Sequence, residues 1–275
     1  GRIAVIHKAL YGLKSSGAAW RNMFAGTLYD LGFKSSLADP DVWMRPAIHH
    51  GKQYYEYIFV YVDDLLVLST DPQKIMTTLS KIYGLKEGSI EKPKQYLGAQ
   101  IKEFRPIDNP SQVCWSMSSE KYVKEAIHNV ELELAKNNQR LPTKVSTPFS
   151  SNYRPELDVS SMLNPSQMNY YQQIIGVLRW MVELGRIDIH LPVALLAQYL
   201  AQPRIGHLEQ AFHIFAYLKR HDRSRIVLDP SRPQINEQNF IKADWTDFYR
   251  DATDIMPPNA PEPRGNAVIM SCFID

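Results

Sequence analysis

One apolar stretch that carries two adjacent carboxylates constrains the fold of this chain more than any other. Residues 57–69 read Tyr-Ile-Phe-Val-Tyr-Val-Asp-Asp-Leu-Leu-Val-Leu-Ser. One strand-forming segment therefore precedes Asp63 and Asp64, and another follows them. This pattern predicts a tight β-hairpin with buried strands and both acids in its turn. Two anions beside buried strands are costly unless a cation compensates them, and Mg²⁺ prefers carboxylate oxygens. An ordinary Asp-Asp turn is the alternative, although surface hairpins normally alternate polar and apolar positions.

Composition bounds the class of protein. The chain has 275 residues, 44% of them hydrophobic and 22% charged, which is typical of a soluble globular protein with one large or two modest domains. The net charge of +2 is too small to argue for a polyanionic ligand by itself. No apolar run is long enough to span a membrane, and the two cysteines have no metal-type spacing, so we expect a reduced, intracellular setting. The chain starts without Met, and we expect it to be a piece of something longer.

Helices and strands are expected on both sides of the hairpin. A helix should begin at Ser15-Ser16 and end at Gly32, and its apolar residues, Trp20 among them, are interpreted as core. A second helix should run from Asp71-Pro72 to Gly84, and a third should follow Ser118-Ser119. Shorter patterns predict strands at 42–44, 95–101 and 113–117.

The composition changes after residue 135. Residues 136–166 are rich in Asn, Pro, Ser and Thr and lack periodicity, which indicates a linker that contains the domain boundary. Three helical patterns follow, at 171–182, 191–199 and 208–218, and together they predict a small helical module. The pair His207 and Glu209 has the spacing of a zinc deaminase, but no Pro-Cys-x-x-Cys accompanies it, so that reading fails.

Three groups of residues resemble a known family. Tyr61-Val62-Asp63-Asp64 resembles the Tyr-x-Asp-Asp signature of reverse transcriptases. Leu10-Tyr11-Gly12-Leu13-Lys14, followed by Ala19-Trp20, resembles a block of copia-type retrotransposon polyproteins, although Ser15-Ser16-Gly17 stands where the family has Gln-Ala-Pro. Segments around Arg179-Trp180, Arg186–Ile189 and Tyr217–Lys219 are similar to the region that follows the palm.

The resemblance implies an α+β fold, in which a truncated palm (an antiparallel sheet with helices on one face) precedes a small helical thumb or connection module. The implied domains are a partial palm over 1–135, a linker over 136–166 and a helical module over 167–228. Residues 229–275 would then be a Pro-rich connector leading into the first strand of a ribonuclease H domain, with Asp275 as its metal-binding remnant and Asp244 as a competing match.

The resemblance also implies roles for single residues. Asp63 and Asp64 would bind Mg²⁺ or Mn²⁺, and Lys86, by itself a surface lysine, would protonate the pyrophosphate leaving group. Tyr61 and Val62 would lie along the primer end, and a second element would grip it: Tyr96, Leu97 and Gly98. In that element Gly98 could instead mark a bulge.

Two basic segments are candidates for contact with nucleic acid. The first lies around a glycine before the first expected helix and consists of Lys8, Tyr11, Gly12 and Lys14. This arrangement suits contact with a phosphate backbone, and a solvated loop is the alternative. The other is either a phosphate contact or a solvated helix end: Lys219, Arg220, His221, Arg223 and Arg225.

The resemblance implies that the parent protein is an RNA-directed DNA polymerase. Its partners would be an RNA template, a DNA primer, deoxynucleoside triphosphates and the rest of the Pol polyprotein, including integrase and ribonuclease H, in a cytoplasmic virus-like particle or in the nucleus. Reverse transcriptases carry a further Asp upstream of the Leu-Tyr-Gly block, and this chain begins only a few residues before that block. We therefore expect the chain alone not to polymerise. The alternative is a decayed or co-opted module that only binds nucleic acid.

Overall fold

The chain divides after residue 91 into two compact units. The computed structural model describes residues 12–86, 88–229, 244, 246–252, 255 and 257–265. The first unit comprises residues 1–91 and 231–275, and the second comprises residues 92–230. The sequence placed a boundary within 136–166, but Leu141 and Val145 of that segment are buried in the core of the second unit.

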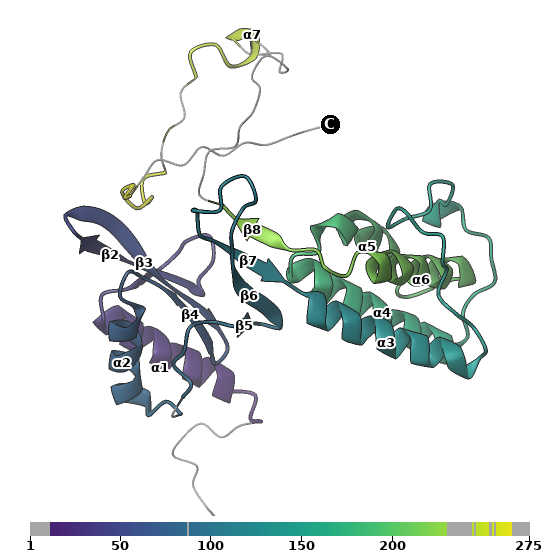
Figure 1. Cartoon of the computed structure of the whole chain (residues 1–275), viewed down its shortest axis with the longest axis horizontal. Coiled ribbons are helices and arrows are strands. Elements are labelled where there is room, and N and C mark those ends of the chain that lie inside the picture. Colours follow the sequence, from purple (N-terminus) through teal and green to yellow (C-terminus); the bar gives the residue numbers. More distant parts are fainter. Residues whose placement is uncertain are drawn as a thin grey trace, which may run out of the picture. The chain divides into compact units, whose positions relative to one another are not determined.

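The first unit is a four-stranded antiparallel sheet with two helices on one face. The strands pair in sequence order: β1 (Lys34–Ser35), β2 (Val42–His49), β3 (Lys52–Tyr61) and β4 (Asp64–Leu68). α1 (Ser16–Asp30) precedes the sheet and α2 (Pro72–Tyr83) follows it, and both lie against the same face (Figure 1). A short helix, α7 (Thr246–Tyr249), also belongs to this unit.

Alternation along the strands determines which side chains meet the helices. In β3, Ile58 points into the core beside Phe24 and Leu28 of α1 and Ile75 and Leu79 of α2. Both predicted helices are present, and α2 starts where the sequence indicated, because the Asp71 carboxylate accepts a hydrogen bond from the Lys74 amide at 3.2 Å. α2 ends at Gly84, whose φ of 59° is the left-handed conformation that glycine adopts readily.

A charged pair is buried in this core. Glu56 of β3 is 8% exposed and accepts hydrogen bonds from Arg45 of β2 at 2.6 and 2.9 Å. Ser69, just after β4, donates to the same carboxylate at 2.8 Å, and Arg45 also donates to the Leu31 carbonyl at 2.7 Å. Burial alone would raise the pKa of Glu56, but the hydrogen bonds and charge of Arg45, with the Ser69 bond, outweigh it and lower that pKa.

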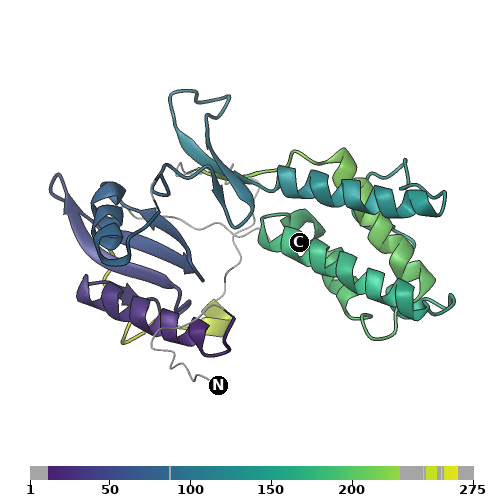
Figure 2. The ribbon, with the colours of Figure 1, turned by 90° about the horizontal axis from the view of Figure 1, so that it is seen from below.

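The second unit joins a small sheet to a helical bundle. Its antiparallel sheet pairs four strands in order: β5 (Gln95–Tyr96), β6 (Ala99–Phe104), β7 (Cys114–Ser118) and β8 (Ile226–Leu228). The bundle contains the remaining helices, which pack alongside one another (Figure 2): α3 (Glu120–Lys136), η1 (Pro155–Leu157), α4 (Pro165–Glu183), η2 (Ile187–Ile189), α5 (His190–Ala197) and α6 (Ile205–Arg220).

The irregular segment before α4 is fixed to the bundle by a polar network. Tyr153 donates to the Asp158 carboxylate at 2.5 Å, and Asp158 also accepts from the Ser160 amide at 2.7 Å. His207 accepts from the Arg204 amide at 3.0 Å and lies 3.1 Å from the Pro155 carbonyl, so this histidine has a structural place at the start of α6. Gly206 leaves room for the network, because a Cβ there would lie 2.0 Å from the Asp158 carboxylate.

Two local expectations differ from the structure. Residues 95–101 do not form one strand, because Leu97 and Gly98 have φ values of 50° and 91° and make the turn of a hairpin between β5 and β6. The turn after β3 consists of Val62 and Asp63, and Asp64 already begins β4. The architecture as a whole is a mixed α and β fold with antiparallel sheets, as expected, and in the described residues no helix is long and apolar enough to cross a bilayer.

Replacing Glu56 with Gln should destabilise the first unit by about 2 kcal/mol, because a partly buried arginine loses its counter-charge. The loss in the free energy of unfolding should be smaller than for a fully buried ion pair, because the Arg45 side chain is 30% exposed. A carboxylate with a lowered pKa stabilises the fold above its unfolded pKa, and that stability disappears as pH falls through the folded pKa. Urea unfolding of the wild type should therefore show an acid-side loss that Glu56→Gln reduces. Asp41→Asn, which breaks an exposed pair with Arg21, is the near-neutral control.

Replacing Gly206 with Ala should destabilise the second unit by about 1–3 kcal/mol, since the new methyl group displaces the Asp158 carboxylate from its partners. Gly176→Ala is the matched control in the same bundle. It lies in α4, and a Cβ there meets no atom within 4 Å, so its effect should be neutral or stabilising. Equal thermal unfolding of the two variants would contradict this prediction.

Candidate metal-binding hairpin

The two aspartates lie at the end of the β3–β4 hairpin. Tyr61 and Asp64 face each other as the last residue pair of the ladder, and Val62 and Asp63 form a two-residue loop between them. Val62 has a positive φ of 56°, whereas Asp63 does not. Two-residue hairpin loops of types I′ and II′ both place their first residue at positive φ, and both match the twist of the flanking strands.

Val62 is an unusual residue for that position. The first residue of such a loop is normally glycine, asparagine or aspartate, because a β-branched side chain clashes at positive φ. Holding a residue there costs on the order of 1–3 kcal/mol and requires the surrounding structure to enforce it. The strain is adjacent to the two carboxylates.

Trp20 of α1 supplies one such constraint. Its indole N–H donates a 2.9 Å hydrogen bond to the Val62 carbonyl. The Trp20 ring stacks on Phe24 with centroids 5.6 Å apart and meets the edge of Tyr83, the last residue of α2, at 5.4 Å. The Tyr83 hydroxyl in turn lies 2.5 Å from the Thr27 hydroxyl. An aromatic cluster from both helices therefore supports the turn.

The carboxylates of Asp63 and Asp64 are without a protein partner in the part of the chain that the structure describes. Both residues are exposed, and among the described residues neither side chain accepts a hydrogen bond or forms an ion pair. Adjacent carboxylates with free oxygen lone pairs are the donor set that a hard divalent cation takes, so the pair fits Mg²⁺ or Mn²⁺. Two carboxylates alone do not complete such a site, and the described residues contain no cluster of three or more His, Cys, Asp or Glu that would.

The outer face of the same sheet is aromatic. Tyr55, Tyr57 and Phe59 follow one another on β3 with ring centroids 6.2 and 6.3 Å apart, and Tyr61, 48% exposed, continues the row to the turn. The two aspartates therefore lie at one end of a row of aromatic side chains, whose other end, Tyr55, contacts Glu262 and Arg264.

The other predicted residues are distributed as follows. Gly12 and Lys14 are exposed just before α1, and Lys86 is exposed after α2. Lys8, Tyr11 and Asp275 lie outside the described residues. Asp244 is exposed, and its carboxylate accepts a hydrogen bond from the Thr246 amide at 3.0 Å.

Tyr96, Leu97 and Gly98 belong to the second unit. Gly98 has the positive φ that its turn requires, so its conformational role is local. The three residues lie at the turn between β5 and β6.

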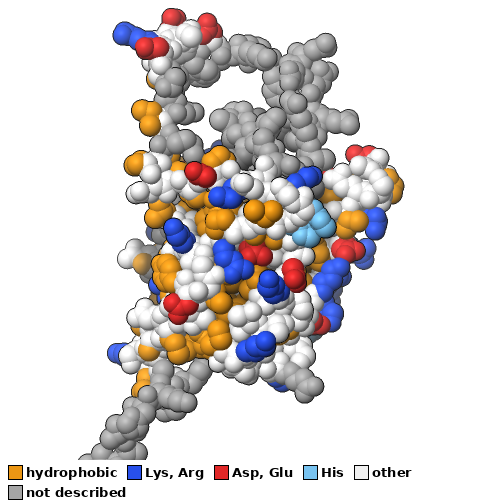
Figure 3. All heavy atoms as spheres, turned by 90° about the vertical axis from the view of Figure 1, so that its left-hand side faces the viewer, with side chains coloured by type: hydrophobic (Ala, Val, Ile, Leu, Met, Phe, Trp, Pro, Cys, Tyr) orange, Lys and Arg blue, Asp and Glu red, His pale blue; other side chains and the backbone are white. Residues whose placement is uncertain are grey.

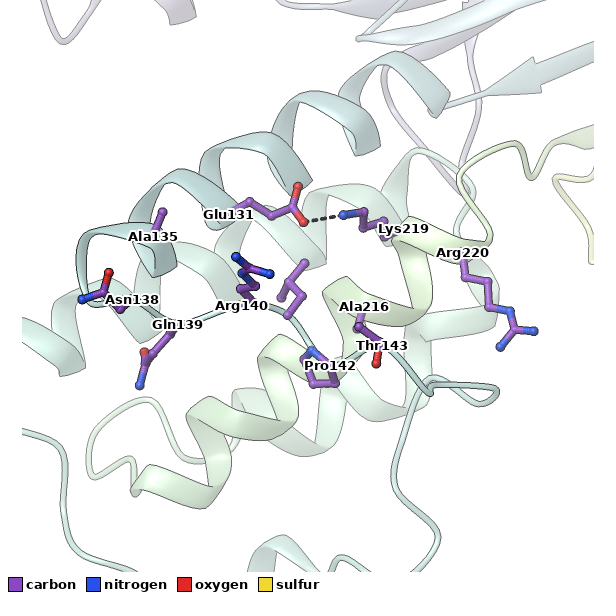
Figure 4. Close-up of a pocket in the computed structure, with 11 residues that line it drawn as sticks. Glu131, Ala135, Asn138, Gln139, Arg140, Pro142, Thr143, Ala216, Lys219 and Arg220 are labelled. Atoms are coloured by element: carbon purple, nitrogen blue, oxygen red, sulfur yellow. Dashed lines mark hydrogen bonds and ion pairs between the residues drawn. The ribbon is translucent and has the colours of Figure 1, made fainter.

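The basic cluster at the end of α6 is partly occupied by internal contacts. Lys219 pairs with Glu131 at 2.5 Å, Arg220 donates to the Val145 carbonyl at 3.3 Å, and Arg225 lies over the Phe104 ring. Arg140, Lys219 and Arg220 line a groove of about 710 Å³ between α3 and α6 (Figure 4). A basic groove is thus present, but Glu131 reduces its positive charge.

Charge on the surface is otherwise mixed. On the face that Figure 3 presents, Lys and Arg side chains lie among acidic and apolar ones without forming a continuous basic stripe. The net charge of +2 is consistent with this distribution.

Sequence reasoning missed the role of Trp20. Its helical spacing with Phe24 and Leu28 indicated core packing, which the stacked ring confirms only in part, because the residue is half-buried and its N–H is used at the turn. An indole on the first turns of a helix is a possible donor, but the partner lies 42 residues away in the sequence.

Comparison with known proteins decides the family. A family profile described as reverse transcriptase (RNA-dependent DNA polymerase) matches residues 1–144, which is more than half of the chain and includes the hairpin. The chain belongs to the reverse transcriptase family.

Relatives place this reverse transcriptase chain among copia-type retrotransposons. It is 30% identical over 217 residues to a transposon Ty5-1 protein of Saccharomyces cerevisiae, covering 78% of this chain and 63% of that protein. It is 26% identical over 246 residues to the retrovirus-related Pol polyprotein from transposon RE1 of Arabidopsis thaliana, and 23% identical over 244 residues to the yeast transposon Ty1-DR1 Gag-Pol polyprotein. These matches cover 88% and 86% of this chain but only 15% and 13% of the polyproteins. No solved structure matches the chain.

If Asp63 and Asp64 bind a ligand and do not stabilise the fold, replacing one of them with a neutral residue should not destabilise the reverse transcriptase chain. Asp63→Asn removes repulsion between neighbouring carboxylates that have no described partner, so its melting temperature without metal should equal or slightly exceed that of the wild type. Differential scanning calorimetry in a chelating buffer measures this. A marked loss of stability would show that Asp63 has a structural partner.

Proposed function

We propose that this chain supplies the metal-binding hairpin of an RNA-directed DNA polymerase of a copia-type retrotransposon. The observation that carries the proposal is the pair Asp63 and Asp64, exposed and unpartnered on a strained turn within the family-matched region. Its substrates would be an RNA template, a DNA primer and deoxynucleoside triphosphates.

The carboxylates of Asp63 and Asp64 would hold Mg²⁺ or Mn²⁺. When bound, such ions neutralise charge on the triphosphate and orient the oxygens of an in-line displacement. The protein's part is to present the carboxylate oxygens in a fixed geometry, and a rigid two-residue turn supports this better than a long loop does. The exposed Tyr61 and Val62 would contact the primer terminus beside the acids.

Other segments would contribute binding. Lys8, Tyr11, Gly12 and Lys14 would approach the nucleic-acid backbone, and Lys86 would donate a proton to pyrophosphate. Tyr96, Leu97 and Gly98 would contact the primer from the second unit. These assignments rest on the resemblance, with the exposure of Gly12, Lys14 and Lys86 as support.

The wider setting follows from the relatives. Two of them are named as Pol or Gag-Pol polyproteins, so integrase and ribonuclease H would be neighbours of this chain in its parent protein. An intracellular, virus-like-particle or nuclear location is proposed on the same ground.

Primer extension on an RNA template tests the function. We expect the 275-residue chain to bind Mn²⁺ through the pair but not to extend the primer by itself, because a two-metal clamp needs a further carboxylate. Mn²⁺ binding is measured by electron paramagnetic resonance on monodisperse protein, and extension on the same sample.

Asp63→Asn and Asp64→Asn are the controls, and Asp41→Asn is the matched exposed aspartate outside the pair. Mn²⁺ affinity unchanged in both pair variants would refute the metal site. If the wild-type chain extends the primer and Asp63→Asn does not, the chain completes the site with a carboxylate outside the described residues. Template binding without metal binding would favour a non-catalytic nucleic-acid-binding module.

A further inference from the structure

We propose that Trp20 is a positioning residue for the Asp63 carboxylate, acting through the peptide that joins Val62 to Asp63. The inference rests on the proposed metal-binding function of the hairpin. In it, a residue of α1 holds the turn of the β3–β4 hairpin in one conformation. Trp20 itself touches neither metal nor substrate.

The position of the hydrogen bond is the first argument. The Val62 carbonyl belongs to the central peptide of the two-residue turn, and types I′ and II′ differ in the orientation of that peptide. By donating to this carbonyl at 2.9 Å, the indole favours one orientation over the other. Since Asp63 directly follows this peptide, the direction of the Asp63 side chain depends on the orientation of the peptide.

Backbone strain is the second argument. Val62 has a φ of 56° and is 69% exposed, so its own side chain gains little burial that would hold it in this conformation. Without the indole bond, the turn is free to relax toward a less strained backbone. A ligand geometry defined to within about 0.5 Å does not survive such a relaxation.

The rigidity of the donor is the third argument. The Trp20 ring is held between Phe24 of α1 and Tyr83 of α2, with a stacked contact to one and an edge contact to the other. Phe24 and Tyr83 also meet each other at 5.5 Å, so three rings and two helices fix the indole. A donor that is itself immobile loses little entropy on binding and holds its acceptor in one place.

The test uses Trp20→Phe in the whole chain, which keeps a stacking ring and removes only the N–H donor. Trp43→Phe is the matched control, because Trp43 is 5% exposed in the same core and its ring contacts Tyr29 of α1. Hydrogen exchange of the amides of residues 62–64 is measured by NMR without metal, with Ile58 in the same hairpin as an internal reference.

We expect exchange at residues 62–64 to become about tenfold faster in Trp20→Phe, as the loss of one hydrogen bond predicts, with Ile58 unchanged. Mn²⁺ affinity should weaken by about two- to tenfold in the same variant. Trp43→Phe should change neither quantity beyond the effect of its altered stability.

The outcomes separate the two proposals. If Asp63→Asn weakens Mn²⁺ binding but Trp20→Phe changes neither that affinity nor the exchange of the turn, Trp20 is only a core residue and the inference is overturned. If both Asp63→Asn and Asp64→Asn leave Mn²⁺ affinity unchanged, the metal function fails and the positioning role fails with it. Faster exchange together with weaker Mn²⁺ binding supports both.

Discussion

The buried pair of Arg45 and Glu56 determines the register on which the hairpin depends. A carboxylate on the core face of a sheet is tolerated only if it is paired, and Glu56 accepts hydrogen bonds from Arg45 of β2 and from Ser69 just after β4. Arg45 in turn donates to the Leu31 carbonyl just after α1. Because side chains alternate along a strand, a slip of one residue would move Glu56 to the outer face and leave Arg45 unpaired. The register that satisfies the pair is the one that places Val62 and Asp63 in the turn.

The second unit uses the same principle. Arg186 is 1% exposed and forms a two-point pair with Asp188 at 2.7 and 2.9 Å, and the Tyr217 hydroxyl donates to that carboxylate. Burial raises the pKa of Asp188, but the bonds and charge of Arg186 outweigh it and lower that pKa. Networks of this kind favour one arrangement of the elements that contribute to them, although the buried Nη1 of Arg186 has no hydrogen-bond partner in the described part of the chain.

Much of this architecture could be predicted from the sequence, and the exceptions have physical causes. Periodicity was sufficient for α1 and the hairpin, and periodicity together with the capping residue Asp71 was sufficient for α2, because those signals are local. Ser15 makes no side-chain capping bond to α1. The turn at Leu97-Gly98 was missed since a single glycine within apolar sequence resembles a strand with a bulge. Residues 136–166 looked like a linker because two isolated apolar residues, Leu141 and Val145, show no period although they are buried.

The candidate site was harder to predict than the fold, because its support is not local. The motif located Asp63 and Asp64, but neither the strain at Val62 nor the bond from Trp20 has a sequence signature. The pair contrasts with three acids of the structure that are held by several partners. Glu56, Asp158 and Asp188 each accept several hydrogen bonds, and their pKa values are lowered by those partners. Asp63 and Asp64 have no such partner among the described residues, and they lie in and directly after a hairpin loop that holds Val62, a β-branched residue, at positive φ. Under the proposed metal-binding function, an external cation would complete the charge balance of these two neighbouring carboxylates.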